Sequence, residues 1–328
     1  MKKYIISRIL LMFVLLAMVS VFSFIVIQLP PGDFVTRYVA LLEREMGQAL
    51  GPEFQIALRQ QLGFDKSKTE QYFFWMRNFL RGDMGRSMEY RVSVNSLIRD
   101  RLPITVVLSV ITMGFTYLFA IPIGIFSARK QYSIGDYIFT FLAFIGIATP
   151  SFFLALVLMY FFSRYFGLSV GGINSIEFLG APPSFAKFVD TLKHLPLPIF
   201  VIMLQGMAGI VRVMRGQVLD EIKRPYVVAA RARGLEENSL IYRYPVRVAM
   251  NPIISSMGNM LAAVVSGMTI TAIVMNVPSI GLLLFNSLLA QDMYLAASCI
   301  MILSTMTVIG MFISDILLAV MDPRIRLD

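Results

Sequence analysis

Six separate apolar stretches, each about 20 residues long and nearly free of charge, constrain this chain more than any other feature. A helix of about 20 residues crosses the hydrocarbon core of a bilayer, and a helix satisfies its own backbone hydrogen bonds in lipid. Hydrophobic residues make up 57% of the chain and charged residues only 15%, which is beyond the range of a soluble domain. The sequence therefore predicts an all-α polytopic membrane protein, with six transmembrane helices at roughly residues 9–29, 104–127, 138–162, 195–214, 253–276 and 296–318.

The first apolar stretch is expected to be a retained helix rather than a cleaved signal peptide. Basic residues precede it, as in a signal, but its apolar run of about 21 residues exceeds the roughly 7 to 15 of a signal sequence. No small-x-small cleavage site follows it. We therefore expect residues 1–29 to form an N-terminal transmembrane helix.

The distribution of Lys and Arg predicts the orientation. If the N-terminus is cytoplasmic, the inside segments carry 15 basic residues and the short outside loops carry three. The other eleven lie between Pro30 and Leu102, a segment long enough to translocate regardless of its charge. Both termini are thus expected in the cytoplasm of a multi-pass cell-membrane protein, and the formal charge of +9 is a topology signal rather than a nucleic-acid surface.

Residues 30–102 are expected to form a small helical extracytoplasmic segment. Apolar residues recur three and four apart over about 35–46, 52–62 and 68–80, which predicts three amphipathic helices. A loop follows at Phe79–Met88, where two glycines allow a tight path and Asp83 and Arg86 could pair across it. This loop is either a structural turn or a docking surface for an external partner.

Two prolines fall at the start of a span or within one. Pro103 suits the first turn of its helix, where the missing N–H has no cost. Pro150 lies in mid-span and is expected to kink the third helix, with Thr149 and Ser151 either satisfying the freed backbone or lining a pathway.

The sequence shows no recognisable set of catalytic residues. The single cysteine, Cys299, and the single histidine, His194, lie in different spans, and we expect both to be structural. No phosphate-binding G-x-x-x-x-G-K-[ST] loop occurs. Asp315 is the one acidic residue within a span, near its cytoplasmic end, so ion-coupled transport is disfavoured. The sequence predicts a protein that is not an enzyme and that holds no metal or cofactor of its own.

Between Arg215 and Pro252 the chain leaves the membrane and returns to it. Pro225 predicts a helix start, small and apolar residues continue to Ala232, and Gly234 predicts its end. A second helical turn is expected from Glu236. The small side chains would let a groove of another protein close around this helix, whereas its arginines would equally suit an interfacial helix on anionic lipid.

Motifs spread over the whole chain resemble the inner-membrane permease subunit of binding-protein-dependent ABC importers, in the dipeptide and oligopeptide branch. Together they are specific, although each alone is weak. In chain order they are Pro31-Gly32-Asp33, Leu62-Gly63-Phe64-Asp65, Gly82-Asp83-Met84-Gly85-Arg86-Ser87, Leu102-Pro103-Ile104-Thr105, Pro150-Ser151-Phe152, Ala230-Arg231-Ala232-Arg233-Gly234-Leu235, Asn251-Pro252 and Asp322-Pro323-Arg324-Ile325-Arg326.

The resemblance implies a type I permease fold, with a core of five helices over 103–328 and a cytoplasmic coupling loop at 215–252. It implies two cytoplasmic ATPase subunits that bind ATP and Mg²⁺, a second homologous permease chain, an extracytoplasmic solute-binding protein and a lipid surround. ATPase coupling would involve Tyr226, Ala229, Ala230, Arg231, Arg233, Gly234 and Leu235. Asp83 and Arg86 would dock the binding protein. Polar residues of the fifth span, namely Ser266, Thr269, Thr271 and Asn276, would line the pathway.

Two departures from the family pattern bear on this expectation. Val228 lies six residues before Gly234, where the wider superfamily often has a glutamate. Ala272 lies before the turn of the fifth span, where relatives in this branch often have a second glutamate. The turn of the fifth span reads Pro278-Ser279-Ile280-Gly281. The solute classes that fit are oligopeptides, oligosaccharides and metal complexes such as nickel. A membrane scaffold or receptor without transport activity is the competing class.

Overall fold

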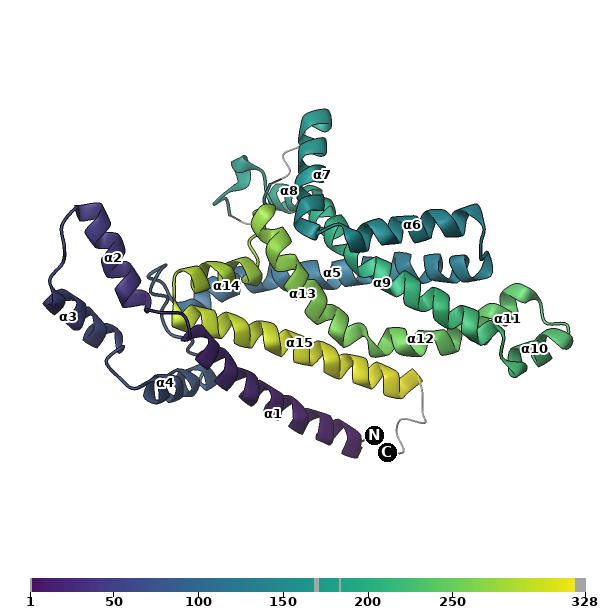
Figure 1. The fold of residues 1–328 in the computed structure, drawn as a ribbon, viewed down its shortest axis with the longest axis horizontal. Coiled ribbons are helices and arrows are strands. Elements are labelled where there is room, and N and C mark those ends of the chain that lie inside the picture. The colour runs from purple at the N-terminus through teal and green to yellow at the C-terminus, as the bar shows by residue number, and fades with distance from the viewer. Residues whose placement is uncertain (1, 168–170, 183, 322–328) are drawn as a thin grey trace. The chain divides into compact units, whose positions relative to one another are not determined.

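The computed structural model describes residues 2–167, 171–182 and 184–321, apart from the side chains of 2–4, 259, 261–263, 265–267 and 321. This part of the chain is helical, and its one β-bridge joins Arg86 to Ser93. Figure 1 shows the elements. They are α1 (Lys2–Ile27), α2 (Phe34–Met46), α3 (Pro52–Leu62), α4 (Lys68–Leu80), α5 (Val94–Arg129), α6 (Ile134–Ala148), α7 (Ser151–Phe166), η1 (Ile176–Phe178), α8 (Phe185–His194), α9 (Pro196–Ile222), α10 (Pro225–Ala232), α11 (Glu237–Arg243), α12 (Pro245–Ser255), α13 (Met257–Val274), α14 (Ile280–Leu289) and α15 (Met293–Met321).

Within the described residues, four helical stretches are long and apolar enough to cross a membrane, or five if a bent pair counts as one span. The four are Ile5–Ile27, Val94–Arg129, Phe185–Ile222 and Met293–Val320, and the bent pair is α6 with α7. The predicted span at 253–276 is not among them; it coincides with the end of α12 and with α13, several of whose side chains lie outside the described residues. The all-α polytopic class is confirmed, whereas the count of six stays a prediction.

The chain divides into two compact units. The predicted division by membrane topology at residues 29 and 102 stays a prediction. The first unit contains Met1–Arg8, Thr105–Pro278 and Met306–Asp328. The second unit contains Ile9–Ile104 and Ser279–Thr305.

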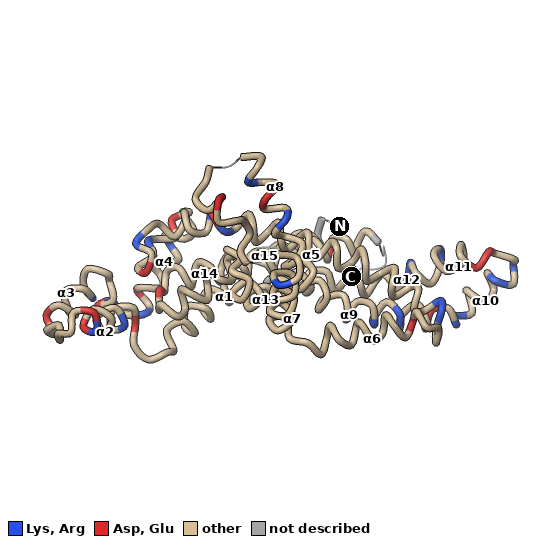
Figure 2. The backbone as a smooth tube through the Cα atoms, turned by 90° about the horizontal axis from the view of Figure 1, so that it is seen from above, with Lys and Arg blue, Asp and Glu red and all other residues tan. Residues whose placement is uncertain are grey.

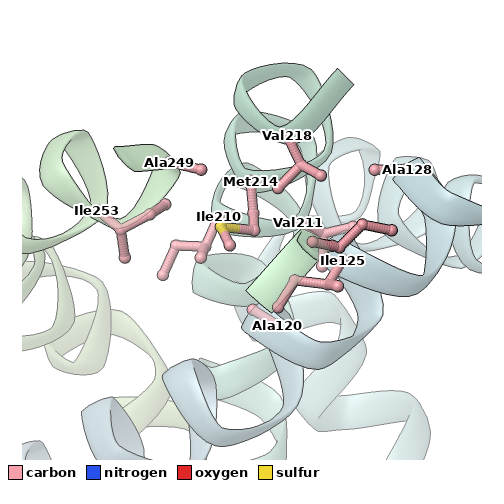
Figure 3. Packing of buried hydrophobic residues seen from close by; sticks show 10 residues of the cluster. Ala120, Ile125, Ala128, Ile210, Val211, Met214, Val218, Ala249 and Ile253 are labelled. Carbon is pink, nitrogen blue, oxygen red and sulfur yellow. The ribbon is translucent and has the colours of Figure 1, made fainter. Parts of the chain in front are cut away.

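The core of the first unit is built around α9. Buried side chains of α5, α9, α11 and α12 meet there, and Figure 3 shows their packing. The cluster consists of Ala120, Ile125, Ala128, Ile210, Val211, Met214, Val218, Ile241, Ala249 and Ile253. Since α9 also packs against α6, α7 and α13, it connects the apolar helices of this unit with the polar segment that follows it.

A glycine brings α5 and α9 close together. A Cβ placed on Gly124 would lie 2.6 Å from Met214 Cβ and 3.0 Å from the Val211 carbonyl oxygen. Such close contact between helices requires a residue without a side chain. Met214 is fully buried over it.

An ion pair between a buried aspartate and a half-buried arginine joins α6 to α9. Arg215 donates from Nε and Nη2 to the two carboxylate oxygens of Asp136, at 3.0 and 2.9 Å. The Tyr132 N–H donates to the same carboxylate at 3.0 Å. Arg215 lies inside α9, which continues eight residues beyond the predicted end of the span at 214. The cytoplasmic loop expected at 215–252 is therefore mostly helical.

Two expectations about prolines are wrong in detail. Pro150 does not kink one helix but ends it: α6 and α7 meet at 107° across Thr149 and Pro150. Proline lacks the N–H that would continue α6, and it disfavours helical backbone at the preceding residue. Pro103 lies inside α5 rather than in its first turn, because α5 begins at Val94.

Contacts in the second unit account for the start of α5 at Val94, ten residues before the predicted start of the span at 104. Val94 and Ile98 are buried against Ile280 and Leu283 of α14 and Leu295 of α15. This burial keeps the turns before Pro103 helical. Cys299 is fully buried in the same cluster, as expected of a small hydrophobe.

The three amphipathic helices predicted in this unit, α2, α3 and α4, are confirmed close to their predicted bounds. A second hydrophobic cluster of the unit joins α1, α4 and α15. Trp75 is packed between Phe24 of α1 and the α15 residues Met293, Ala297 and Met301.

The close approach at Gly124 gives a test of the fold. We expect Gly124→Ala to destabilise the protein by about 1–3 kcal/mol, since the added methyl overlaps Met214 and Val211. Gly114 lies on the same helix, and a methyl added there would have nothing within 4 Å, so Gly114→Ala is the matched control and should be neutral or slightly stabilising. Thermal unfolding of both variants in detergent measures the difference. Equal Tm values for the two variants would contradict the packing described here.

Candidate functional site

The first candidate site is the pair of short helices α10 and α11, which follows α9. Pro225 occupies the first turn of α10, where proline is favoured, and Gly234 adopts a φ of +79° just beyond its end. A left-handed residue at this point lets the chain reverse into α11. The predicted helix, stop and second helix are therefore confirmed. In Figure 1 this pair lies beyond α9, beside α12.

A small hydrophobic core holds the two helices together. Val227 and Ala230 of α10 are buried against Leu240 of α11, and Leu235 and Tyr244 pack around them. Ala230 therefore belongs to the inside of the pair and does not offer its side chain to a partner. Leu235 is half-buried in the same core.

The opposite face of α10 is open. Of the predicted coupling residues, Tyr226, Ala229, Arg231, Arg233 and Gly234 are exposed. Val228, at the position where a glutamate is common in the wider family, is 51% exposed. The exposed face therefore combines little side-chain bulk near Ala229 and Gly234 with positive charge. Figure 2 shows the concentration of charged residues at α10 and α11.

Polar contacts fix the shape of the pair. Arg231 donates two hydrogen bonds to the carboxylate of Glu237, at 3.0 and 2.8 Å, which lowers the pKa of that carboxyl. Tyr226 donates to Glu221 at the end of α9. Partial burial, and next the neighbouring Glu221 carboxylate, raise the pKa of Tyr226 to about 12, so the phenol stays protonated at neutral pH.

The pair is also anchored to the first unit. Ile241 of α11 is a member of the buried cluster formed by α5, α9 and α12. Arg129 at the end of α5 donates a hydrogen bond to Asn238 of α11. Displacement of α10 and α11 would therefore be transmitted to α9 and α12, because the contacts are packed side chains and not a flexible linker.

The second candidate site is the loop at Gly82–Arg91 in the second unit. The predicted pairing of Asp83 with Arg86 is wrong. Asp83 Oδ1 accepts from the Gly85 N–H at 2.9 Å, while Arg86 donates from Nε and Nη2 to the Arg91 carbonyl. Each side chain satisfies a nearby backbone group instead, as is common in tight turns.

Asp292, which the sequence did not single out, fixes this loop. Its fully buried carboxylate accepts from Ser87 Oγ at 2.6 Å and from the backbone N–H groups of Met88 and Glu89 at 2.8 and 3.2 Å. It also accepts from the Leu295 N–H at the start of α15. An aspartate directly before a long apolar helix is an N-cap signal, which could have identified it.

The predicted pathway residues do not form one set. Thr271 is fully buried in α13, Thr269 is half-buried, and both have polar partners. Asn276 lies beyond the end of α13, exposed and with a φ of 53°, so it is not part of the fifth helix. The side chain of Ser266 lies outside the described residues, as does the whole terminal motif from Asp322 to Arg326.

His194 and Asp315 have local structural partners. His194 Nδ1 lies 2.8 Å from the Asp190 carbonyl oxygen, one turn earlier in α8. Asp315 pairs with Arg8 at 3.2 Å. Neither residue belongs to either candidate site.

Several helices long and apolar enough to cross a membrane, with a compact polar helix pair packed onto one of them, are the features of an all-α polytopic membrane protein. Comparison with known proteins agrees. The chain belongs to the family of binding-protein-dependent transport system inner membrane components, whose model matches residues 120–327. The N-terminal model of the same transport systems matches residues 1–109.

Individual relatives match from end to end. The chain is 32% identical to the oligopeptide transport system permease protein AppB of Bacillus subtilis, over 99% of this chain and 100% of the relative. It is 30% identical to the oligopeptide transport system permease protein OppB of Haemophilus influenzae, over the same shares. The nickel import system permease protein NikB of Staphylococcus aureus is 26% identical, over 99% of this chain and 92% of the relative.

The pair of Arg231 and Glu237 predicts a pH dependence. The folded-state pKa of Glu237 lies below its ordinary value of 4.5 because of the bonds from Arg231, so the pair stabilises the fold above that value. This contribution to stability is lost as the pH falls through the lowered pKa of Glu237.

We expect Glu237→Gln to lower Tm at pH 7, and the difference in Tm from wild type to vanish in acid. Glu45 is exposed and forms no ion pair with the described residues, so Glu45→Gln is the control. A Tm difference independent of pH would contradict the assignment.

Proposed function

We propose that this chain is one half of the membrane pathway of an ATP-driven importer of oligopeptides, and that α10 is the point at which the motor acts. The observation that carries this proposal is the open, small-residue face of α10 on a helix pair whose buried side is packed into the core around α9. Such a pair suits a role in transmitting force, because it is accessible on one face and rigidly attached on the other.

The energy source would lie on other chains. We place ATP and Mg²⁺ on two cytoplasmic ATPase subunits, each gripping one coupling helix, with none held by this polypeptide. A second, homologous permease chain would supply the other half of the pathway. Closure of the ATPases would displace α10 and α11, and Ile241 would pass the displacement to α9 and α12.

The topology would place both termini and the α10–α11 pair in the cytoplasm of the cell-membrane protein. The excess of basic residues on that side supports this orientation. The second unit's loop with Asp83 and Arg86 would then lie outside, where it could dock a solute-binding protein. Its rigid attachment through Asp292 supports a docking role, since a fixed loop loses less conformational entropy on binding.

For the pathway itself, we propose that polar groups of the fifth helix, Ser266, Thr269 and Thr271, with Asn276 at its end, contact solute or water when the helices rearrange. Oligopeptides are the preferred solute because the relatives named above with at least 30% identity carry that name. A nickel complex is the second candidate, supported by NikB at 26% identity. Oligosaccharides have no support among these relatives.

A charge on the open face tests the coupling role. We expect Ala229→Glu to leave membrane insertion and Tm unchanged and to lower ATP-dependent uptake roughly tenfold. A tenfold loss corresponds to a contact between α10 and the ATPase subunit that is weaker by about 1.4 kcal/mol. Gly234→Glu is a poorer probe, because the φ of +79° would strain any side chain there.

Two variants control for charge and for folding. Ser239 is exposed on α11, and Ser239→Glu should leave uptake unchanged if α10 is the gripped element. Ala230→Glu should instead destabilise the helix pair, since Ala230 is buried. Normal uptake with Ala229→Glu would reject the coupling role of this face.

Solute uptake separates the functional classes. We expect a strain that lacks this gene to lose ATP-dependent uptake of radiolabelled oligopeptides and to keep uptake of nickel and oligosaccharides. Complementation with the wild-type gene should restore it, and complementation with Ala229→Glu should not. Loss of nickel uptake alone would favour a metal-complex permease, and unchanged uptake of all three would favour a scaffold or receptor.

A further inference from the structure

The second unit contains a cleft of about 800 Å³, whose lining includes Asp83 and Arg86 of the proposed docking loop and to which the proposed transport cycle assigns no solute. Its walls come from α2, α3, α4, the loop at Asp83–Arg91 and Tyr294 of α15. This volume is within the range of pockets that bind small molecules. The cleft is therefore large enough for a ligand of a few amino-acid residues.

Positive charge in the cleft is not balanced by the protein. Lys66, Arg86 and Arg91 line it, and Asp83 is the one acidic residue among the lining side chains. No carboxylate of the described chain lies within 4 Å of these three cations. Asp83 is directed to the Gly85 N–H. An anionic ligand would therefore meet cations whose charge no described carboxylate neutralises by direct contact.

Other carboxylates of the second unit have partners outside the lining. Glu70, whose charge acts on Lys66 through space, accepts hydrogen bonds from the Ser67 N–H and hydroxyl. Asp33 pairs with Arg59 at 2.7 Å, and Glu89 lies 3.9 Å from Arg37. Neither Asp33 nor Glu89 lines the cleft. The lining therefore carries three cationic side chains against one carboxylate.

Aromatic rings hold two of the cations in place. The guanidinium carbon of Arg91 lies 5.7 Å from the centroid of the Tyr38 ring, and its Nη2 is 2.5 Å from the Tyr38 hydroxyl. Lys66 Nζ lies 5.6 Å from the Phe74 ring centroid. Contacts of this kind orient a cation without neutralising it, so its remaining donors stay available to a carboxylate.

The rest of the lining suits a polypeptide backbone. Exposed amide side chains of Gln60 and Gln61 can each donate and accept hydrogen bonds, as peptide groups require. Phe74 is 54% exposed and offers an apolar contact for a side chain. Amide, aromatic and cationic groups therefore meet in one cleft.

We infer that this cleft is a binding site for a short peptide, whose terminal carboxylate is held by Lys66 and Arg91 and whose backbone is bound by Gln60 and Gln61. The inference rests on the proposed function as a peptide importer. It adds a solute site on the permease chain itself, apart from the membrane pathway. Peptide released beside the second unit would be retained there at raised local concentration.

The one tryptophan of the chain provides a direct probe. Trp75 is the sole tryptophan in the sequence and lines this cleft. Its emission, recorded for the full-length chain in lipid nanodiscs, should shift when acetyl-tetraalanine is titrated, since this peptide has a free carboxylate and no aromatic group. Acetyl-tetraalanine amide, which lacks the charge, should bind about fivefold more weakly or worse. Isothermal titration calorimetry would detect binding that leaves the emission unchanged.

Matched variants locate the site. We expect Lys66→Gln and Arg91→Gln each to weaken binding of acetyl-tetraalanine about fivefold, with little effect on the amide. Arg44 on α2 is exposed and does not line the cleft, so Arg44→Gln has the same charge change and should bind as wild type. Raised salt should weaken binding of the free acid.

Three results would overturn the inference: no binding by either method, equal affinity for acid and amide, or an equal loss in Arg44→Gln. An emission change caused by purified solute-binding protein without solute, and not by peptide, would also overturn it in favour of protein docking. These outcomes are separate from failure of the proposed function, because oligopeptide uptake by intact cells is measured independently of peptide binding to the isolated chain.

Discussion

The packing of α9 against α5 and α12 is the interaction on which the rest of the first unit depends. Met214 fills the space left by Gly124, and Ile241 extends the same cluster to α11. A close-packed interior resists local deformation, so helices in contact through it move together. The short helices that a motor could grip are thus joined mechanically to the helices that would open or close a pathway.

The two units use different means to position their polar segments. In the first, α10 and α11 are held by a small apolar core and by Arg231 with Glu237. In the second, one buried carboxylate, that of Asp292, holds a loop through a hydroxyl and two backbone N–H groups. A buried carboxylate is stable there because three donors and a helix N-terminus compensate for its lost hydration.

Local signals predicted local structure well. The bounds of α2, α3, α4 and α10 follow from apolar spacing and from Pro225 and Gly234, which act within a few residues. Errors arose where distant residues decide the outcome. The early start of α5 accompanies the burial of Val94 by α14 and α15, and Arg215, past the predicted end of the fourth span, is paired with Asp136. Neither partner is near in sequence, so periodicity could not reveal them.

The candidate site was predicted as a segment but not as a surface. Spacing alone placed Ala229 and Ala230 together, whereas the structure separates an exposed from a buried alanine because Leu240 covers only the second. Charge proximity suggested a bond between Asp83 and Arg86, but nearby backbone groups satisfied both side chains first. Side-chain direction, which decides both cases, depends on tertiary contacts that a single sequence does not specify.

The ion pair between Asp136 and Arg215 has a consequence for biogenesis. Its members are 79 residues apart, so the carboxylate emerges from the ribosome well before the guanidinium that matches it. The contact that fixes the start of α6 against α9 can therefore form only after α9 has been synthesised.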